Sequence, residues 1–368
     1  MAKHEASPRE TRKKKTGDKR RFKWLAIPLL ALLYLAGAVS IAAGTVMVKN
    51  ADADYTYDGS LKDKTNEDLS ISEDLPLTGE QEKKVTNIAL FGIDARNAKS
   101  FSGNSDSIMI VSIDEIHNKV KVTSVMRDTL VNIPDKGWGK LNSAYGRGGP
   151  ELAVKTLNQM FNLNIRDYAA VNFVGMVDII DELGGIEVDV TESERKDANV
   201  HITSMASEVG TKKDLIKKKG LQILSGVQAV CWARIRHVST ADGVSYDFGR
   251  TDRQRYVMEQ LFDKAMSAGV SQYPGMIKAL LPYVQTSLDY GQILSLAGDL
   301  VGGITFEQMR IPQMEYLIDG NYTARTGSST VYYNLEYAGR LLWAFIYDDK
   351  SPADFMAENG IDKTRWAG

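Results

Sequence analysis

An uninterrupted apolar segment, residues 24–48, restricts the fold of this chain more than any other feature of its sequence. The segment holds no charged side chain, and a helix of this length, rising about 1.5 Å per residue, crosses roughly 30 Å of hydrocarbon. Lysines and arginines crowd into residues 1–23, and such residues accumulate on the cytoplasmic side of a membrane. The sequence therefore predicts a basic cytoplasmic tail, one transmembrane helix and an extracytoplasmic remainder from Lys49 onward.

A cleaved signal peptide is the alternative interpretation of this segment. Ala51 and Ala53 offer the small residues of a cleavage site, but the apolar core of a signal peptide usually has about 7 to 15 residues. The single cysteine, Cys231, excludes an intrachain disulfide, so an outward-facing domain must be stabilised by packing. We therefore expect a bacterial cell surface as the location, and a small buried core residue as the role of Cys231.

Beyond the apolar segment, composition divides the chain into a stalk and a domain. Residues 49–84 are too polar to offset the entropy of folding, which predicts a solvated stalk. Residues 85–368 carry alternating strand and helix patterns, which predict an α/β domain with a central sheet. The expected strands are 87–93, 108–114, 119–125, 186–190 and 308–312, and the expected helices are 150–161, 174–183, 250–268 and 334–347.

Two local patterns add detail to this outline. Gly184 and Gly185 follow the helix at 174–183 and are predicted to end it, because glycine adopts the left-handed conformation that stops a helix. Residues 191–219 are polar and rich in lysine. This composition predicts a surface insertion that could partly cover a cleft.

Two carboxylates lie where neighbouring strands are expected to end and begin. Asp94 directly follows the strand ending at Ile93, and Asp106 lies just before the strand beginning at Ile108. If the strands are neighbours, both carboxylates project at one end of the sheet and suit Mg²⁺, whose other positions are filled by water and phosphate oxygens. In the alternative, which spacing alone favours, each carboxylate caps a turn or pairs with Arg96.

Arginines and one glutamine form a second group of candidate residues. Arginine presents a rigid fork of donors that matches phosphate oxygens, so converging arginines beside a carboxylate pair predict a phosphate or pyrophosphate site. The alternative is a network of arginines and aspartates on a solvated face. An outward-facing domain without interleaved aromatic residues does not suit a nucleic-acid surface. The candidates are Arg127, Arg234, Arg236 and the trio Asp247, Arg250 and Gln254, which shares one face of a helix.

Seven motifs, in order and spacing, resemble the LytR-CpsA-Psr family. They cover about residues 85–268, and the remainder resembles the family's C-terminal extension. The motifs are Phe91 to Arg96, Ser105 to Ile108, Met126 to Thr129, Lys140 to Tyr145, Leu183 to Ile186, Ala233 to Arg236, and Asp247 to Arg250 followed by Arg253 and Gln254.

This resemblance implies a central mixed β-sheet flanked by helices and an enzyme of the Gram-positive cell envelope. Such an enzyme transfers a glycopolymer, of the wall teichoic acid or capsular polysaccharide type, from a membrane-embedded polyprenyl (undecaprenyl-type) pyrophosphate carrier to peptidoglycan, and forms a phosphodiester. Carried over by position, Asp94 and Asp106 are expected to bind Mg²⁺, with Mn²⁺ as the other candidate. The expected pyrophosphate-binding residues are Arg127, Arg234, Arg236, Arg250 and Gln254, and the expected catalytic residues are Arg127 and Asp247, the latter orienting the arginines or taking the acceptor proton.

Two departures from the family pattern keep other functions open. Asn104 stands where the family commonly has an arginine, and Met126 stands where a proline usually precedes the Arg-Asp-Thr segment. A missing arginine is compatible with a non-catalytic protein that binds or escorts the lipid-linked polymer, and water in place of the acceptor would give a pyrophosphatase. A transcriptional role fits poorly with a cytoplasmic part of about 23 residues.

Overall fold

The computed structural model describes residues 56–95, 97, 99–240, 243, 246–267, 279–298, 305–313 and 330–360. The predicted cytoplasmic tail and transmembrane helix lie outside these ranges. Within them, no helix combines the length and the apolar character that crossing a bilayer requires.

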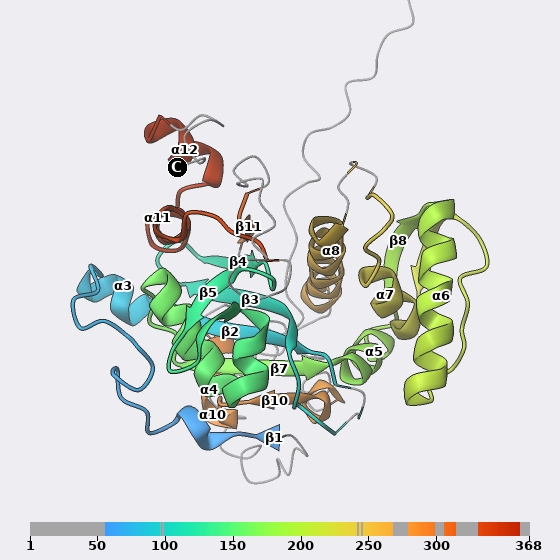
Figure 1. The fold of residues 1–368 in the computed structure, drawn as a ribbon, viewed down its shortest axis with the longest axis horizontal. Helices are drawn as coiled ribbons and strands as arrows, with labels where there is room; N and C mark the ends of the chain where they lie inside the picture. Colours follow the sequence, from blue (N-terminus) through green and yellow to red (C-terminus); the bar gives the residue numbers. More distant parts are fainter. Residues whose placement is uncertain are drawn as a thin grey trace, which may run out of the picture.

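A seven-stranded sheet forms the centre of the molecule, with the strand order β1-β10-β7-β2-β3-β4-β11 (Figure 1). β2 is parallel to β7, β4 to β11 and β1 to β10, while the remaining neighbours are antiparallel. The predicted mixed sheet is thereby confirmed. Its strands are β1 (Thr56–Tyr57), β2 (Val85–Ile93), β3 (Ser105–Asp114), β4 (Lys119–Val125), β7 (Asp167–Asn172), β10 (Val284–Thr286) and β11 (Thr305–Ile311).

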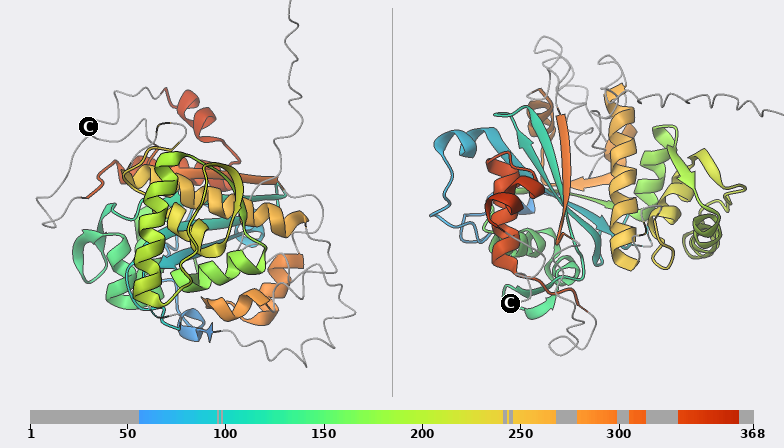
Figure 2. Two further views of the ribbon diagram at one scale, coloured as in Figure 1. Left: turned by 90° about the vertical axis from the view of Figure 1, so that its right-hand side faces the viewer. Right: turned by 90° about the horizontal axis from the view of Figure 1, so that it is seen from above.

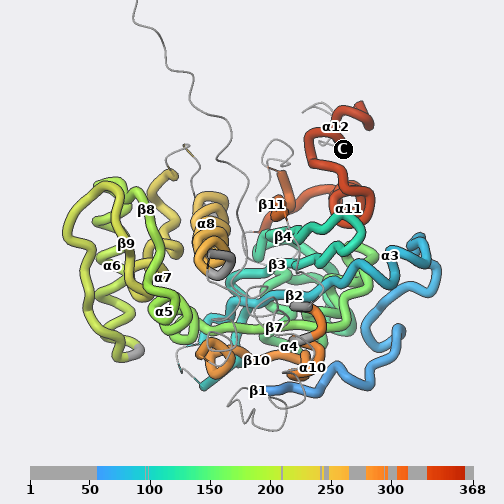
Figure 3. The backbone as a smooth tube through the Cα atoms, turned by 180° about the vertical axis from the view of Figure 1, so that it is seen from behind, coloured from blue at the N-terminus to red at the C-terminus, as the bar shows by residue number. Residues whose placement is uncertain are grey.

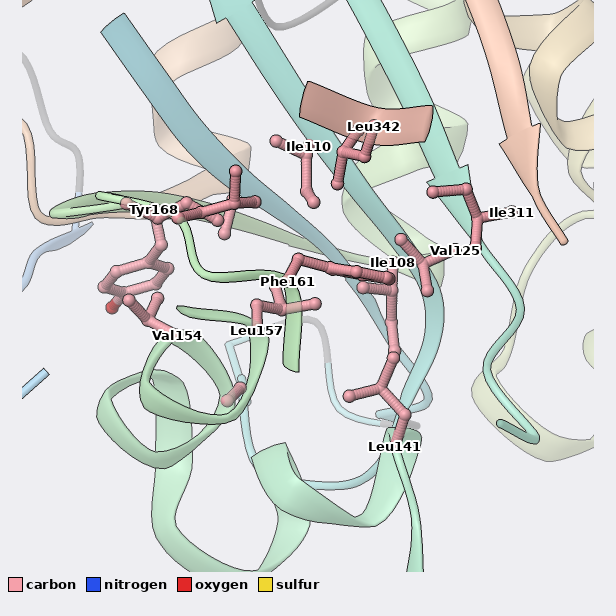
Figure 4. Close-up of a cluster of buried hydrophobic side chains, with 14 of the residues drawn as sticks. Ile108, Ile110, Val125, Leu141, Val154, Leu157, Phe161, Tyr168, Ile311 and Leu342 are labelled. Carbon is pink, nitrogen blue, oxygen red and sulfur yellow. The ribbon is translucent and has the colours of Figure 1, made fainter. Parts of the chain in front are cut away.

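Side chains of the central strands alternate between two separate hydrophobic layers. In β3, Met109 and Val111 belong to one buried cluster, whereas Ile108 and Ile110 belong to the other. This alternation follows from the two-residue period of a strand. Figure 4 shows the second cluster, in which Ile108 and Ile110 pack with Phe161 and Leu342. The sheet is therefore covered on both faces.

Helices cover the two faces unequally, as the view from above in Figure 2 shows. The first face carries α5 (Phe173–Glu182), α7 (Gly226–Ala233) and α8 (Tyr246–Ser267), with α6 (Glu192–Val209) and the small sheet of β8 (Ile186–Val190) and β9 (Gly220–Leu224) further out. The second face carries α4 (Asn142–Phe161), α11 (Leu335–Tyr347), α12 (Pro352–Glu358) and a hairpin of β5 (Leu130–Ile133) and β6 (Gly137–Lys140). α3 (Gly79–Lys84) precedes β2, α10 (Tyr290–Gly298) follows β10, and the 3₁₀ turns are η1 (Gly59–Leu61) and η3 (Leu281–Tyr283).

The prediction of a solvated stalk is wrong for residues 56–84, which are part of the domain. β1 pairs with β10 at the edge of the sheet, and the segment then runs along the second face to α3 (Figure 3). Leu61, Leu69 and Ile71 are buried there. These residues follow neither a strand nor a helix period, and they lie in a segment that is polar on average. Neither pattern nor composition therefore indicated that they are buried.

Most of the polar segment 191–219, which was predicted to be a surface insertion, forms α6. Thr191 and Glu194 make reciprocal capping bonds at the start of this helix. Ala198, Ile202 and Met205 are buried at helical spacing, and α6 packs against α7. In the described part of the chain, α6 contributes no residue to the lining of two cavities between the first face of the sheet and α5, α7 and α8.

Other predicted elements are largely confirmed, although α4 begins at Asn142 and not at Pro150, and β5, β6, β9, β10 and α7 had no predicted counterpart. β4 and β8 have the predicted bounds, but β8 pairs only with β9 and lies outside the central sheet. β7, a central strand of the sheet, was not predicted. The predicted end of α5 is confirmed, because Gly184 and Gly185 adopt positive φ angles and their N–H groups bond to the carbonyl oxygens of Asp181 and Ile180.

A buried ion pair of the sheet and its neighbouring contacts hold the end of α11 against the sheet. Lys121 Nζ donates to Asp114 Oδ2 at 2.7 Å and to the carbonyl oxygen of Ile346 at 2.9 Å, and the Lys121 and Asp114 side chains are both fully buried. Lys119 Nζ bonds both carboxylate oxygens of Asp349 at 2.7 and 2.8 Å. Asp114, His117 and Asp349 converge here, but the lysine ammonium groups among them make this an ion-pair network and not a cation site.

Replacing Lys121 by methionine is expected to lower the free energy of unfolding by about 3 to 5 kcal/mol, because it leaves the buried Asp114 carboxylate without its lysine partner. Chemical denaturation of the two proteins measures the difference. Lys84→Met is the control, because Lys84 pairs with Glu80 on the exposed surface and its loss should change little. Equal effects of the two substitutions would contradict a structural role for the buried pair.

The Asp349 contacts predict an acid-sensitive part of the stability. Burial alone would raise the pKa of Asp349, but hydrogen bonds from Lys119 and Lys121 outweigh it and hold the pKa below its ordinary value of 3.8. A lowered pKa stabilises the fold fully above the unfolded-state value, and this contribution disappears as the pH falls through the folded-state value. The difference in Tm between the wild type and Asp349→Asn should therefore be constant from pH 7 to about pH 5 and shrink below pH 4. A difference that grew towards low pH would refute this.

Candidate functional site

Asp94 and Asp106 lie at the same end of the sheet, as the sequence predicted. β2 and β3 pair in register up to Ile93 and Ser105, with a bulge beside Gly92. The Asp94 N–H donates to the carbonyl oxygen of Asn104 at 3.0 Å, which closes the connection between the two strands. Asp94 is exposed, and the Asp106 side chain is 17% exposed. Carboxylate oxygens are therefore open to solvent at this edge.

Arg127 connects this edge to the segment after β4. Its Nη1 donates to Asp106 Oδ1, and its Nε lies 3.4 Å from Asp128 Oδ2. Asp128 also accepts a 2.7 Å hydrogen bond from Lys140 Nζ. The carbonyl oxygen of Arg127 accepts from the N–H of Asn142 at 3.0 Å, so backbone contacts hold its main chain in place. Among the described residues, Asp106 therefore pairs with Arg127; Arg96, the partner that the sequence also offered, lies outside them.

The other predicted residues come from the ends of α7 and α8. Arg234 is the C-terminal cap of α7, and its guanidinium carbon lies 4.4 Å from the ring centroid of Phe173. Gln254 lines the same cavity as Arg234, and Arg250 is buried at 3% exposure one turn earlier on α8. Asp247 lies in the first turn of α8, but its side chain is outside the described part of the chain.

Arg234 and Arg236 make the surroundings of α6 electropositive. Burial is the main cause that lowers the pKa of His201, and the positive charges of Arg234 and Arg236 lower it further, against the opposing effect of Asp197. His201 lies on α6, so two of the predicted arginines face the same region. Such a field favours an anionic ligand.

α8 is fixed beside Arg127 by two side-chain contacts. Thr251 Oγ1 lies 3.5 Å from Met126 Sδ, and Arg310 Nη1 of β11 donates to Asp252 Oδ1 at 2.6 Å. These contacts bring the start of α8, with Arg250 and Gln254, against the segment that carries Arg127. Met126 is a departure from the family pattern. Its sulfur contacts the Thr251 hydroxyl, and a proline at this position would lack that contact.

Arg253 and Glu194 support the site, although sequence reasoning assigned them no role. Arg253 is 1% exposed, and its Nε donates to Glu194 Oε1 at 3.0 Å. Its two terminal nitrogens donate to the carbonyl oxygens of Ile235 and Val238 at 3.3 and 2.8 Å. These bonds hold the backbone on both sides of Arg236. The available signal was the capping pattern from Thr191 to Glu194, which placed a glutamate at the start of a helix.

An apolar channel lies between the first face of the sheet and the helices α5, α7 and α8. Two adjoining cavities share Gly92, Ser107, Met109, Val171, Met176 and Met258. The first extends to Leu90 and Ile179, and the second ends at Arg234 and Gln254. The channel thus has an apolar body and a polar end, which suits a ligand that is hydrocarbon on one side and charged on the other.

Cys231 takes no part in this site. It lies fully buried in α7, and its sulfur is 3.7 Å from Met205 Sδ. Burial raises its pKa to about 12. The predicted role as a core residue is confirmed.

Comparison with known proteins identifies relatives along most of the chain. The transferase TagU of Oceanobacillus iheyensis, named a polyisoprenyl-teichoic acid–peptidoglycan teichoic acid transferase, is 31% identical over 291 residues, which cover 76% of this chain and 81% of that protein. The crystal structure of Bacillus subtilis TagV superposes with a TM-score of 0.53 at 26% identity, and covers 73% of this chain and 99% of that one. TagT with bound octaprenyl pyrophosphate has the same fold, with a TM-score of 0.53 at 21% identity over 75% and 96% of the two chains.

The family model extends the match beyond the seven motifs. It covers residues 44–336, which include the whole central sheet and every predicted site residue. The chain therefore belongs to the LytR_cpsA_psr family.

Proposed function

We propose that this protein transfers a glycopolymer, of the wall teichoic acid or capsular polysaccharide type, from a polyprenyl pyrophosphate carrier to peptidoglycan. The apolar channel that ends at Arg234 and Gln254, beside the strand ends with Asp94, Asp106 and Arg127, carries this conclusion. Family membership and the name of the TagU relative support it.

The channel suits the carrier of this reaction. Burial of hydrocarbon stabilises a complex by roughly 0.8 kcal/mol per CH₂ group, so isoprene units would be held by side chains such as Met109, Met176 and Met258. Methionine adapts its shape to irregular ligands. The charged end of the carrier would then lie at Arg234 and Gln254, where the channel becomes polar.

The reaction would replace a phosphoanhydride bond of the pyrophosphate by a phosphate ester bond. The acceptor hydroxyl of a muramic acid unit attacks the phosphorus that bears the glycopolymer, and the new O–P bond replaces the bond to the prenyl phosphate, which leaves with the electron pair. Arg127, Arg234, Arg236, Arg250 and Gln254 would donate hydrogen bonds to the phosphate oxygens as their negative charge grows. Asp247 is proposed to orient the arginines or to take the hydroxyl proton.

Asp94 and Asp106 would hold a Mg²⁺ ion, with Mn²⁺ as the alternative. The support for this is the donor set, because two carboxylates from adjacent strand ends supply hard oxygen ligands and one of them is exposed. A bound divalent cation would neutralise charge on the pyrophosphate. Arg127 balances Asp106 in its present arrangement.

A membrane anchor completes the proposal. Residues 24–48 would span the cell membrane once, with residues 1–23 in the cytoplasm and the catalytic domain outside. The charge pattern around the apolar segment supports this orientation. The anchor would place the domain where the lipid carrier and the wall meet.

Arg127→Ala is expected to reduce transfer roughly 100- to 1000-fold, because one donor to the developing charge is lost. The measurement is transfer from a polyprenyl pyrophosphate-linked donor to peptidoglycan by the full-length protein in detergent. A double Asp94→Asn and Asp106→Asn variant, and addition of a chelator to the wild type, should have comparable effects. Arg166→Ala is the control, since Arg166 is exposed at the opposite end of β7.

Full activity of these variants would overturn the assignment of the site. Tight donor binding without turnover in the wild type would instead indicate a binding or escort protein. Phosphate release without peptidoglycan, and no transfer with it, would indicate a pyrophosphatase.

Narrowing the channel should discriminate between long and short donors. In Met176→Trp the larger side chain would fill space that the prenyl chain needs. We expect affinity for octaprenyl pyrophosphate to fall at least tenfold, and affinity for a ten-carbon analogue to change less. Titration calorimetry measures both, and Leu221→Trp, on the exposed face of β9, is the control. Equal losses of affinity for the two ligands would show that the prenyl chain binds outside this channel.

A further inference from the structure

The hairpin of β5 and β6 exposes an aromatic residue near the reaction site. Asn132 and Trp138 are paired across the two strands, lie on one face and are both solvent-exposed, whereas Leu130 on the same face is buried. Val131, Ile133 and Gly139 are buried on the other face. Trp138 is 46% exposed, although tryptophan has more apolar surface to bury than any other residue.

This exposed face is continuous with the candidate site. Lys140 follows Trp138 by two residues and lies on the same face of the strand. Its Nζ is 2.7 Å from Asp128 Oδ1, and Asp128 Oδ2 is 3.4 Å from Arg127 Nε. Backbone bonds reinforce the link, because the N–H of Leu141 donates to the carbonyl oxygen of Thr129 at 2.9 Å. A ligand on Trp138 would therefore extend towards Arg127.

The hairpin and the channel lie on opposite faces of the sheet. Val131 and Ile133 belong to the hydrophobic cluster of the second face, together with α4 and α11. The channel is formed on the first face by α5, α7 and α8, and Figure 1 shows β5 and α8 on either side of the central strands. Arg127 and Asp106 lie at the strand ends between them.

The geometry of in-line displacement at phosphorus determines from which side the acceptor approaches. The attacking and leaving oxygens are roughly opposite each other in such a reaction. The prenyl phosphate leaves on the channel side, so the acceptor hydroxyl has to approach from the side of the hairpin. Pyranose rings carry apolar C–H faces that pack on aromatic rings, and their hydroxyl groups bond to amides such as that of Asn132.

We propose that the exposed face of β5 and β6, with Trp138 as its aromatic platform and Asn132 beside it, binds the acceptor glycan strand of peptidoglycan. This rests on the proposed transfer function. The site sets the direction of the acceptor, while the channel and the arginines bind the donor. Trp138 therefore acts on the acceptor KM, and not on donor binding.

The test compares Trp138→Ala, Trp138→Tyr and the control Leu221→Ala in the full-length protein. Leu221 is also an exposed apolar residue, but it lies on β9 in the small outer sheet. Transfer is followed with uncrosslinked glycan strands as acceptor. We expect Trp138→Ala to raise the acceptor KM roughly tenfold with the donor KM and Tm unchanged, Trp138→Tyr to restore most of the loss, and Leu221→Ala to change neither.

Two outcomes would overturn the proposal. An unchanged acceptor KM in Trp138→Ala would exclude the platform, and a rise in the donor KM instead would show that the face holds the donor polymer. Sedimentation of the protein with insoluble peptidoglycan, without any donor, tests binding when transfer itself is absent. If the wild type sediments and Trp138→Ala does not, the glycan site stands even though the transfer function fails. If both sediment equally, the site is refuted whatever the activity.

Discussion

The alternation of side chains along the central strands is the constraint on which the rest of the structure depends. β2 and β3 are buried on both faces, so successive residues have to fit two different layers. Both layers stop near the strand ends, where Asp94 is exposed and Asp106 is half-buried. The same strands thus separate an apolar channel from a second, fully packed layer and bring polar groups together between them.

Charge balance around the site follows from this geometry. Arginines that gather near one strand end need acidic partners, and three of the described pairs join different elements: Arg127 with Asp106, Arg253 with Glu194, and Arg310 with Asp252. The Arg253 pair is almost fully buried, where loss of one partner costs most. These pairs connect α6, α8, β3 and β11 and fix the frame in which Arg234 and Arg236 are presented.

Sequence patterns predicted the parts of the fold that have a regular period. The side chains of β2, β3 and β4 follow the two-residue period of a strand, which a sequence pattern can detect. The two glycines after α5 identify the end of this helix, because they adopt positive φ angles. The convergence of Asp94 and Asp106 followed from strand adjacency alone. β7 was not predicted because it is short and has Ala169 and Ala170 at its centre. It forms a strand because it lies between two neighbouring strands of the sheet, and no local sequence pattern records that position.

The candidate site was predictable where residues lie on one element and less so where distant elements meet. The shared helix face of Arg250 and Gln254 needed only helical spacing. The support from Glu194 to Arg253 joins residues 59 positions apart, and the Met126 contact with Thr251 spans 125. Such contacts depend on how α6, β4 and α8 pack, and single-sequence patterns carry no information about that packing.

The place of β1 in the sheet has a consequence for where the domain can work. Because Thr56 already pairs with β10, only residues 49–55 separate the sheet edge from the proposed anchor, and a fully extended chain of that length spans at most about 25 Å. A domain joined to the membrane by so short a linker cannot reach the outer layers of a thick wall. Its acceptors would be the glycan strands nearest the membrane, so new polymer would be attached to the youngest layer of the wall and carried outward as further layers form beneath it.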